Sequence, residues 1–359
     1  MAFYIIIWFF ISFFSLPFNI GRYSKIIPLL FLFLLFLYTG LRFEVGGDWD
    51  SYLYKYDKYN YINNFSDFIS ISEPGYGLIN LLSIYFNVDG IYFVNSCCAL
   101  IFYLNFYFFN KRFKNILFPL FVCFTYTIIV VTTGYTRQSV AMGFILLAIS
   151  GVLDQNKIKF FLGVFLAVLF HNTAFLFLIF SPFLFKNLKI NNNDFLFYLY
   201  SVFSISFILV LLYFATLGEL NSYTETDGKM SSGGVYMRLL MHVIPILYYI
   251  YYRPYFLSNF PLFYRFFDYN LIFIVVMFFL ASFLSTLVDR LNLYFFYFDI
   301  LVLLFVYIKS TLEKKILCWV LVFVSNSVVL ILWLNFGKWT ALKWIPYQNY
   351  FSNYILNFF

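Results

Sequence analysis

The sequence predicts an all-α polytopic membrane protein, and three of its features lead to that fold class. Hydrophobic residues form 63% of the 359 residues and charged residues only 11%, whereas a soluble domain carries about 25% charged residues to solvate its surface. The mean hydropathy is +0.85. Apolar runs recur along the whole chain, separated by short basic clusters. Most of the surface must therefore face a lipid bilayer.

Composition and motifs also argue against several function classes. The net charge of +7 comes from basic residues scattered between apolar runs, not from a basic stripe, so no nucleic-acid partner is expected. The chain has no P-loop, H-E-x-x-H or G-x-S-x-G motif, so ATP-driven transport and zinc-protease chemistry lack support. The four cysteines lie inside apolar runs without a C-x-x-C pair and are interpreted as packing residues: Cys97, Cys98, Cys123 and Cys318.

The apolar runs predict about twelve membrane crossings. They are 2–18, 26–41, 90–109, 116–133, 137–153, 160–170, 174–185, 195–217, 237–252, 269–287, 291–308 and 316–335. The runs on either side of His171-Asn172-Thr173 are short and can be half-helices. Residues 75–87 are shorter than the roughly 20 residues that a crossing needs, so they are predicted to form a helix lying at the outer interface.

The distribution of charge predicts how these crossings are oriented. The loops that collect Lys and Arg belong on the cytoplasmic side, which places the N-terminus outside. The outer face then holds the loops 42–89 and 218–236 and the tail 336–359, and the whole chain 1–359 forms one integral-membrane domain. Three tryptophans near the outer end fit an aromatic belt: Trp333, Trp339 and Trp344.

Four arginines lie on this outer face, each within a few residues of an apolar run: Arg42, Arg137, Arg238 and Arg290. The planar guanidinium suits phosphate better than the point charge of lysine does. A single arginine at such a position can equally extend to lipid headgroups. Four of them on the face that the positive-inside rule leaves poor in arginine favour an anionic ligand.

Two segments carry the clearest polar patterns. In Thr39-Gly-Leu-Arg-Phe-Glu-Val-Gly-Gly-Asp-Trp-Asp-Ser-Tyr52, the Gly-Gly pair permits a tight turn that brings Arg42, Glu44 and Asp48 near the membrane boundary. A surface salt bridge at a helix end is the alternative interpretation. In the second segment, Arg137 and Gln138 stand at the N-terminus of the next span, where free N–H groups and a guanidinium together suit an anion.

Three further features contain ionisable groups. His171 interrupts an apolar stretch, and it is either a packing or capping residue or the best proton acceptor of the outer face. Asp289 and Arg290 can satisfy each other as a pair. His242 and Asp299 lie inside predicted spans, where a charged group is costly, so each needs a partner or a polar cavity. They are structural or substrate-channel candidates.

The order of short motifs resembles that of the EpsG-type polysaccharide polymerases. The blocks are Gly40-Leu41-Arg42, Gly46-Gly47-Asp48-Trp49 with Tyr52, Glu73-Pro74-Gly75-Tyr76, Thr136-Arg137-Gln138-Ser139-Val140-Ala141, Phe170-His171-Asn172-Thr173-Ala174, Asp289-Arg290-Leu291 and Trp344-Ile345-Pro346-Tyr347. The resemblance covers nearly the whole chain except 190–280, a stretch expected to set the sugar specificity. It implies a Wzy-type O-antigen or capsule polymerase of the bacterial inner membrane, with a fold similar to GT-C-like glycosyltransferases.

Such enzymes join oligosaccharide repeat units carried on undecaprenyl pyrophosphate, at the periplasmic face and without a metal or other cofactor. The resemblance therefore implies a lipid-linked oligosaccharide as both donor and acceptor, and a chain-length regulator protein as a further partner. On this basis we expect Arg42, Arg137, Gln138 and Arg290, with Arg238, to bind the pyrophosphate. His171 or Asp48 would be the base, and Glu44 would orient an arginine or the acceptor.

The loop 218–236 is expected to act as a lid over the glycan. These roles require the arginines to meet beside the outer leaflet although they lie far apart in the sequence. A flippase for lipid-linked oligosaccharide, an O-antigen ligase and a membrane acyltransferase built around His171 remain the alternatives.

Overall fold

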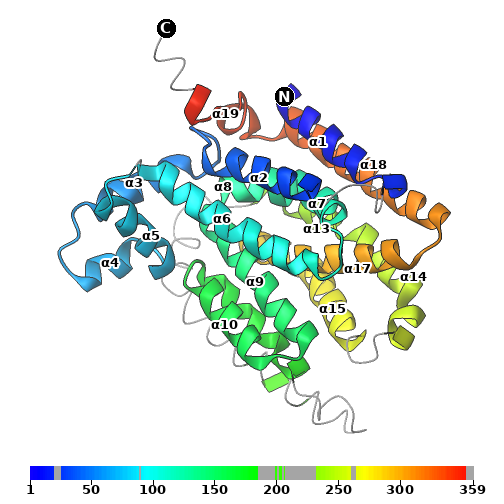
Figure 1. Cartoon of the computed structure of the whole chain (residues 1–359). Coiled ribbons are helices and arrows are strands. Elements are labelled where there is room, and N and C mark those ends of the chain that lie inside the picture. The colour runs from blue at the N-terminus through cyan, green and yellow to red at the C-terminus, as the bar shows by residue number, and fades with distance from the viewer. Residues whose placement is uncertain are drawn as a thin grey trace. The chain divides into compact units, whose positions relative to one another are not determined.

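The computed structural model describes residues 1–19, 26–88, 90–184, 199, 202–203, 206, 232–259 and 264–352. These residues form helices and turns without a β-strand, apart from an isolated bridge between Arg42 and Asn349. The α-helices (Figure 1) are α1 (Ala2–Phe14), α2 (Ile26–Gly40), α3 (Trp49–Tyr59), α4 (Phe65–Ile71), α5 (Pro74–Tyr85), α6 (Gly90–Lys111), α7 (Leu117–Cys123), α8 (Thr132–Gly134), α9 (Thr136–Asp154), α10 (Lys157–Val168), α13 (Val235–Leu240), α14 (Val243–Asn259), α15 (Tyr264–Leu280), α16 (Ser285–Asn292), α17 (Phe296–Lys309), α18 (Leu312–Phe336) and α19 (Thr340–Lys343). Shorter or non-α turns are η1 (Pro17–Asn19), the π-helix η2 (Phe124–Val131), and the 3₁₀ helices η3 (Asn172–Leu184) and η4 (Leu293–Phe295).

The all-helical expectation is confirmed for the described ranges. Within them, five helical stretches are long and apolar enough to cross a membrane: Gly90–Lys111, Leu117–Gly134, Thr136–Asp154, Ser285–Lys309 and Leu312–Phe336. Shorter apolar helices occupy Ala2–Phe14, Ile26–Gly40 and Asn172–Leu184. The count of about twelve crossings stays a prediction. The span expected at 195–217 and residues 218–231 of the expected lid lie almost entirely outside the described residues.

The chain divides into two compact units, each of which is described by itself. The first unit contains Met1–Gly143 and Tyr307–Phe359, and the second contains Phe144–Val306. In the first unit, α2 and α5 both pack on α6. Helices α1 and α18 lie side by side (Figure 1), and the Nε1 of Trp8 donates to Ser327 at 2.9 Å. The Trp8 ring also stacks on Phe121 at 5.1 Å.

The π-helix of the first unit is held by a side chain from α18. Asn326 donates its Nδ2 to the carbonyl of Val122 at 3.2 Å, where α7 gives way to η2. A carbonyl released from the regular helical pattern needs such a donor in an apolar environment. The π-helix then leads directly into α8 and α9, which carry the Thr-Thr-Gly-Tyr-Thr-Arg segment.

In the second unit, α10 and η3 pack together on either side of the expected break. Helix α10 ends at Val168 and η3 begins at Asn172, so the interruption at His171 is confirmed. Helix α10 lies unusually close to α9, since a Cβ built on Gly163 would stand 2.5 Å from the backbone nitrogen of Ala148. Small residues allow this close approach of helix backbones in membrane proteins.

Two boundaries in the second unit differ from the expected runs. Residues 237–252 do not form one helix, because Pro245 has no N–H for the carbonyl of Met241, and the chain turns at Met241 and His242. The turn expected between 287 and 291 instead lies at 281–284. Asp289 and Arg290 are therefore part of helix α16 and not of a loop.

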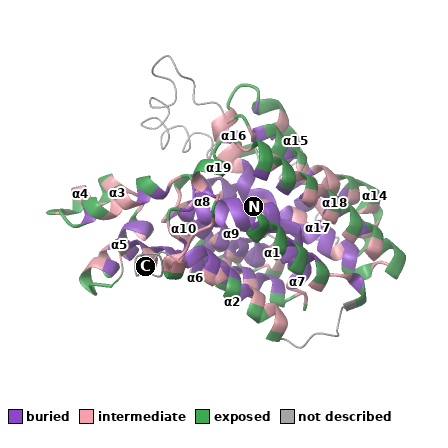
Figure 2. Cartoon of the chain, turned by 90° about the horizontal axis from the view of Figure 1, so that it is seen from above, coloured by how far each residue is buried: buried purple, intermediate pink, exposed green. Residues whose placement is uncertain are grey.

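Burial follows the apolar pattern of the helices. Helices α9 and α17 are almost wholly buried, whereas α1, α2 and α18 expose one face (Figure 2). The exposed residues on these faces are large and apolar, such as Phe9 at 63% and Ile331 at 54% exposure. Apolar faces of this extent on helices of this length are typical of contact with lipid.

Candidate functional site

Three motif blocks that are far apart in the sequence meet in the first unit. The backbone N–H of Phe43 donates to the carbonyl of Gln348 at 3.0 Å, and that of Tyr350 donates to Leu41 at 2.7 Å. Close by, the N–H of Gly46 donates to the carbonyl of Lys343 at 2.8 Å. The segment that follows α2 is therefore held along its length by the segment around α19.

Gly46 and Trp344 connect this pair of segments to the third block. Gly46 has a φ of +115°, and a Cβ built on it would stand 2.2 Å from the carbonyl oxygen of Thr133. Only glycine fits this position. The indole of Trp344 donates its Nε1 to the Thr133 hydroxyl at 2.9 Å and is 5% exposed. The expectation that Trp344 belongs to an aromatic belt is wrong, because its ring is buried against Gly134, whereas Trp339 is 56% exposed.

Arg42 is fully buried within the same junction. Its guanidinium donates to the carbonyls of Val45 at 3.1 Å and Thr39 at 2.6 Å, and to Asn95 Oδ1 at 2.9 Å and Thr136 Oγ1 at 2.7 Å. None of these four acceptors is charged, and burial lowers the pKa of the guanidinium. Arg42, expected as a pyrophosphate ligand, ties α2, α6 and α9 together in this structure.

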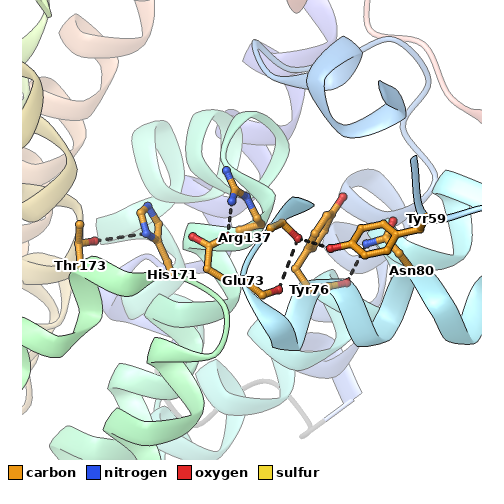
Figure 3. A network of polar contacts seen from close by, with 8 residues as sticks. Tyr59, Glu73, Tyr76, Asn80, Arg137, His171 and Thr173 are labelled. Carbon is orange, nitrogen blue, oxygen red and sulfur yellow. Dashed lines mark hydrogen bonds and ion pairs between the residues drawn. The ribbon is translucent and has the colours of Figure 1, made fainter. Parts of the chain in front are cut away.

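Arg137 forms an ion pair with Glu73 through its NH1 nitrogen (Figure 3). The Arg137 side chain is 25% exposed and that of Glu73 is 9% exposed. The guanidinium also lies over the ring of Tyr52, 6.0 Å from its centroid. Glu73 was absent from the residues expected at the site. The motif Glu73-Pro74-Gly75-Tyr76 could have indicated it, since Pro74 begins α5 and holds Glu73 at the helix end.

The other expected residues of the first unit have different environments. Gln138 is buried, at 3% exposure. Glu44 is exposed, with a φ of 51°. Asp48 precedes α3 and is half-buried. Burial raises the pKa of the Tyr52 hydroxyl to about 12, with a further contribution from Asp48, whereas Arg137 acts in the opposite direction.

In the second unit, Arg238 on α13 pairs with Asp289 on α16. Ser232 donates its hydroxyl to the same carboxylate oxygen at 2.9 Å. The prediction that Asp289 pairs with Arg290 is therefore wrong. Consecutive residues of a helix point in different directions, and Asp289 pairs with Arg238. Arg290 is half-buried on α16.

His171 lies in the break between α10 and η3 (Figure 3). Its Nδ1 stands 3.5 Å from the hydroxyl of Thr173, which in turn lies 3.1 Å from the hydroxyl of Tyr294. The distance from His171 to Thr173 is at the limit of a hydrogen bond.

His242 and Asp299 contact each other, which confirms that each has a partner. The Nδ1 of His242 lies 2.7 Å from Asp299 Oδ1, and its Nε2 lies 2.8 Å from Asn292 Oδ1. His242 is 3% exposed. Because both ring nitrogens face an acceptor oxygen, the contacts favour the imidazolium form. The pair joins the turn before α14 to α16 and α17.

We expect His242→Leu to lower the stability of the protein by about 3–5 kcal/mol, because it leaves the Asp299 carboxylate without its partner. The double variant His242→Leu/Asp299→Leu should regain most of this loss, since no buried charge remains. Thermal unfolding of the purified protein in detergent measures both effects. A double variant less stable than His242→Leu would contradict the ion-pair interpretation.

The expected site residues fall into two sets. Arg42, Glu44, Asp48, Arg137 and Gln138 belong to the first unit, and His171, Arg238 and Arg290 belong to the second. Within the first unit, Arg42 donates to Thr136, which directly precedes Arg137, so these two are brought together. The meeting of all the arginines at one opening stays a prediction. In the described part of the chain, no group of three His, Cys, Asp or Glu side chains could hold a metal ion.

The comparisons with known proteins give one match. The model of a protein family described as the EpsG family matches residues 25–349. No curated protein and no solved structure matches the chain.

Proposed function

The chain belongs to the EpsG family, and from this premise we propose that it joins oligosaccharide repeat units into a bacterial surface polysaccharide. The family and the apolar helices together indicate a membrane protein of the polysaccharide-polymerase kind. The finer proposal is a Wzy-type glycosyltransferase of the inner membrane. It takes repeat units carried on undecaprenyl pyrophosphate and acts at the periplasmic face.

The observation that carries this proposal is the environment of Arg137. Its guanidinium is partly exposed at the start of α9, beside the junction of three motif blocks, and its Nε has no hydrogen-bond partner. One N–H group is occupied by Glu73. A guanidinium with one unused donor, its Nε, at a helix N-terminus favours the binding of a phosphate oxygen.

The proposed reaction needs little from the protein besides positioning and charge. The bond from the anomeric carbon of the donor to the diphosphate oxygen breaks, and the oxygen of an acceptor hydroxyl bonds to that carbon. The diphosphate leaves with the electron pair, and its charge is stabilised by Arg137, with Gln138 beside it and Arg238 and Arg290 as the ligands proposed from the second unit.

The acceptor hydroxyl also gives up a proton during this step. We assign its removal to His171 or Asp48, with Glu44 orienting the acceptor. Arg42 takes a different role, because its guanidinium is occupied by four neutral acceptors. It positions the segments around Arg137 instead of contacting the diphosphate from solvent.

Deletion of the gene tests the proposed function. We expect loss of the long polymer while single repeat units still reach their final acceptor, because only the joining step is removed. The measurement is the glycan ladder on a gel, before and after the gene is restored. Loss of every attached repeat would point to a flippase or a ligase, and an unchanged ladder would contradict all three functions.

A further inference from the structure

The buried polar atoms without a hydrogen-bond partner in the described part of the chain include four on α5, near the start of α6 and at the start of α9. These four are the Tyr76 hydroxyl, Asn80 Oδ1, Asn95 Nδ2 and Arg137 Nε. Tyr76, Asn80 and Asn95 are fully buried. A buried polar atom without a partner costs about 1–3 kcal/mol, so several of them in one unit need a physical reason.

Three of these atoms are donors that lie around two arginines. The Tyr76 ring is 5.5 Å from that of Tyr52, over which Arg137 lies. Asn95 is bound to Arg42 through Oδ1, so its unpaired Nδ2 is held beside that guanidinium.

Hydrogen bonds connect the two sides of this cluster. The NH2 nitrogen of Arg42 donates to Asn95 at 2.9 Å and to Thr136, which directly precedes Arg137, at 2.7 Å. Burial raises the pKa of the Tyr76 hydroxyl, and Arg137 and Arg42 each oppose that rise. Tyr76 thus lies on the Arg137 side of the cluster and Asn95 on the Arg42 side.

The two arginines of this region differ in their acceptors. Glu73 compensates Arg137, but each of the four acceptors of the fully buried Arg42 is neutral. A buried cation is costly unless a negative charge or sufficient hydrogen bonds offset its desolvation. Unused donors beside a buried guanidinium whose acceptors are all neutral indicate that the region suits an anion with several acceptor oxygens.

We propose that Tyr76, Asn95 and Arg137 form an inner subsite that binds one phosphate group, with the hydroxyl, Nδ2 and Nε as its donors. The occupant is a phosphate either of a prenyl diphosphate or of free pyrophosphate, which present the same oxygen atoms. That the phosphate belongs to a prenyl diphosphate and not to free pyrophosphate rests on the proposed function. The existence of the subsite does not rest on it. Asn80 is not part of it, since its unpaired atom is an acceptor and its Nδ2 donates to the carbonyl of Tyr76 at 2.7 Å.

Binding to the purified full-length protein tests the subsite. Inorganic pyrophosphate and farnesyl diphosphate are titrated in detergent, and affinity is measured by calorimetry and by the shift in unfolding temperature. We expect Tyr76→Phe to weaken binding about tenfold or more, because it removes one hydrogen bond to a charged ligand. The unfolding temperature without ligand should stay the same or rise, because an unpaired buried hydroxyl disappears.

Two further variants make the test specific. Tyr59→Phe is the matched control, since the Tyr59 hydroxyl is already bound to Ser72 at 2.7 Å. It should lower the unfolding temperature slightly and leave the affinity unchanged. Asn95→Asp keeps an acceptor for Arg42 but replaces the donor with a negative charge, so it should abolish binding of both ligands in a folded protein.

The outcomes separate the subsite from the proposed function. The subsite is overturned if Tyr76→Phe and Asn95→Asp both bind with the affinity of the wild type. It is also overturned if the wild type shows no saturable binding. Water would then be the partner of these donors. Tyr76-dependent binding in a protein whose deletion leaves the glycan ladder unchanged would support the subsite and overturn the function. Tighter binding of farnesyl diphosphate than of pyrophosphate supports the lipid source, and equal binding supports the free anion.

Discussion

Arg137→Ala is expected to abolish long glycan chains at an unchanged level of protein in the membrane. The variant removes the guanidinium that we assign to the departing diphosphate, and loss of one such preorganised donor costs about 10²–10³-fold in rate. It also leaves the largely buried Glu73 carboxylate without its ion pair. Arg137→Lys should recover only part of the activity, because an ammonium group lacks the planar fork. The measurement is the chain-length ladder from cells that express each variant.

Arg290→Ala should give the same loss of long chains, because Arg290 is the corresponding proposed ligand of the second unit. Lys343→Ala is the control, since it removes a cation whose partner Asp50 is 74% exposed. An exposed ion pair contributes little to stability, so its ladder should equal that of the wild type. Normal ladders from both arginine variants would remove the pyrophosphate assignment.

Gly46→Ala is expected to prevent the first unit from folding. At a φ of +115°, alanine is strained, and its Cβ would stand 2.2 Å from the carbonyl oxygen of Thr133. The overlapping atom of Thr133 is a backbone oxygen, so the overlap cannot be relieved by moving a flexible side chain. The strain alone costs about 1–3 kcal/mol, and the overlap adds to it. The yield of monodisperse protein after detergent extraction measures the effect.

Gly47→Ala is the matched control for this prediction. A Cβ at Gly47 would meet the ring of Trp344 at 3.4 Å, which is an ordinary contact. Its yield and unfolding temperature should therefore stay close to those of the wild type. Equal yields of Gly46→Ala and wild type would show that the junction of α2 with α19 tolerates a different turn.

The sequence predicted the helices better than it predicted their ends. Long apolar runs such as 90–109 and 137–153 correspond to α6 and α9, because hydropathy reports directly on lipid or core contact. Polar residues marked the break at His171. The turn at 281–284 escaped detection, because it contains Phe283 and Leu284 and so looks like part of an apolar run.

The polar contacts of the candidate site were harder to predict. Arg137 and Glu73 are 64 residues apart, and nothing in a single sequence specifies which acid reaches which arginine. The neighbours Asp289 and Arg290 suggested a pair, yet the helix directs Asp289 to Arg238. Arg42 was identified as important, but its complete burial depends on how three helices pack around it.

The first unit is assembled from both ends of the chain, residues 1–143 and 307–359. During synthesis the early helices enter the bilayer long before the segment around Gln348 exists to dock onto Phe43. The turn at Gly46 must therefore wait, incompletely bonded, until translation has passed residue 350. Nascent chains arrested before Trp344 should accordingly be far more sensitive to protease at 41–48 than released ones.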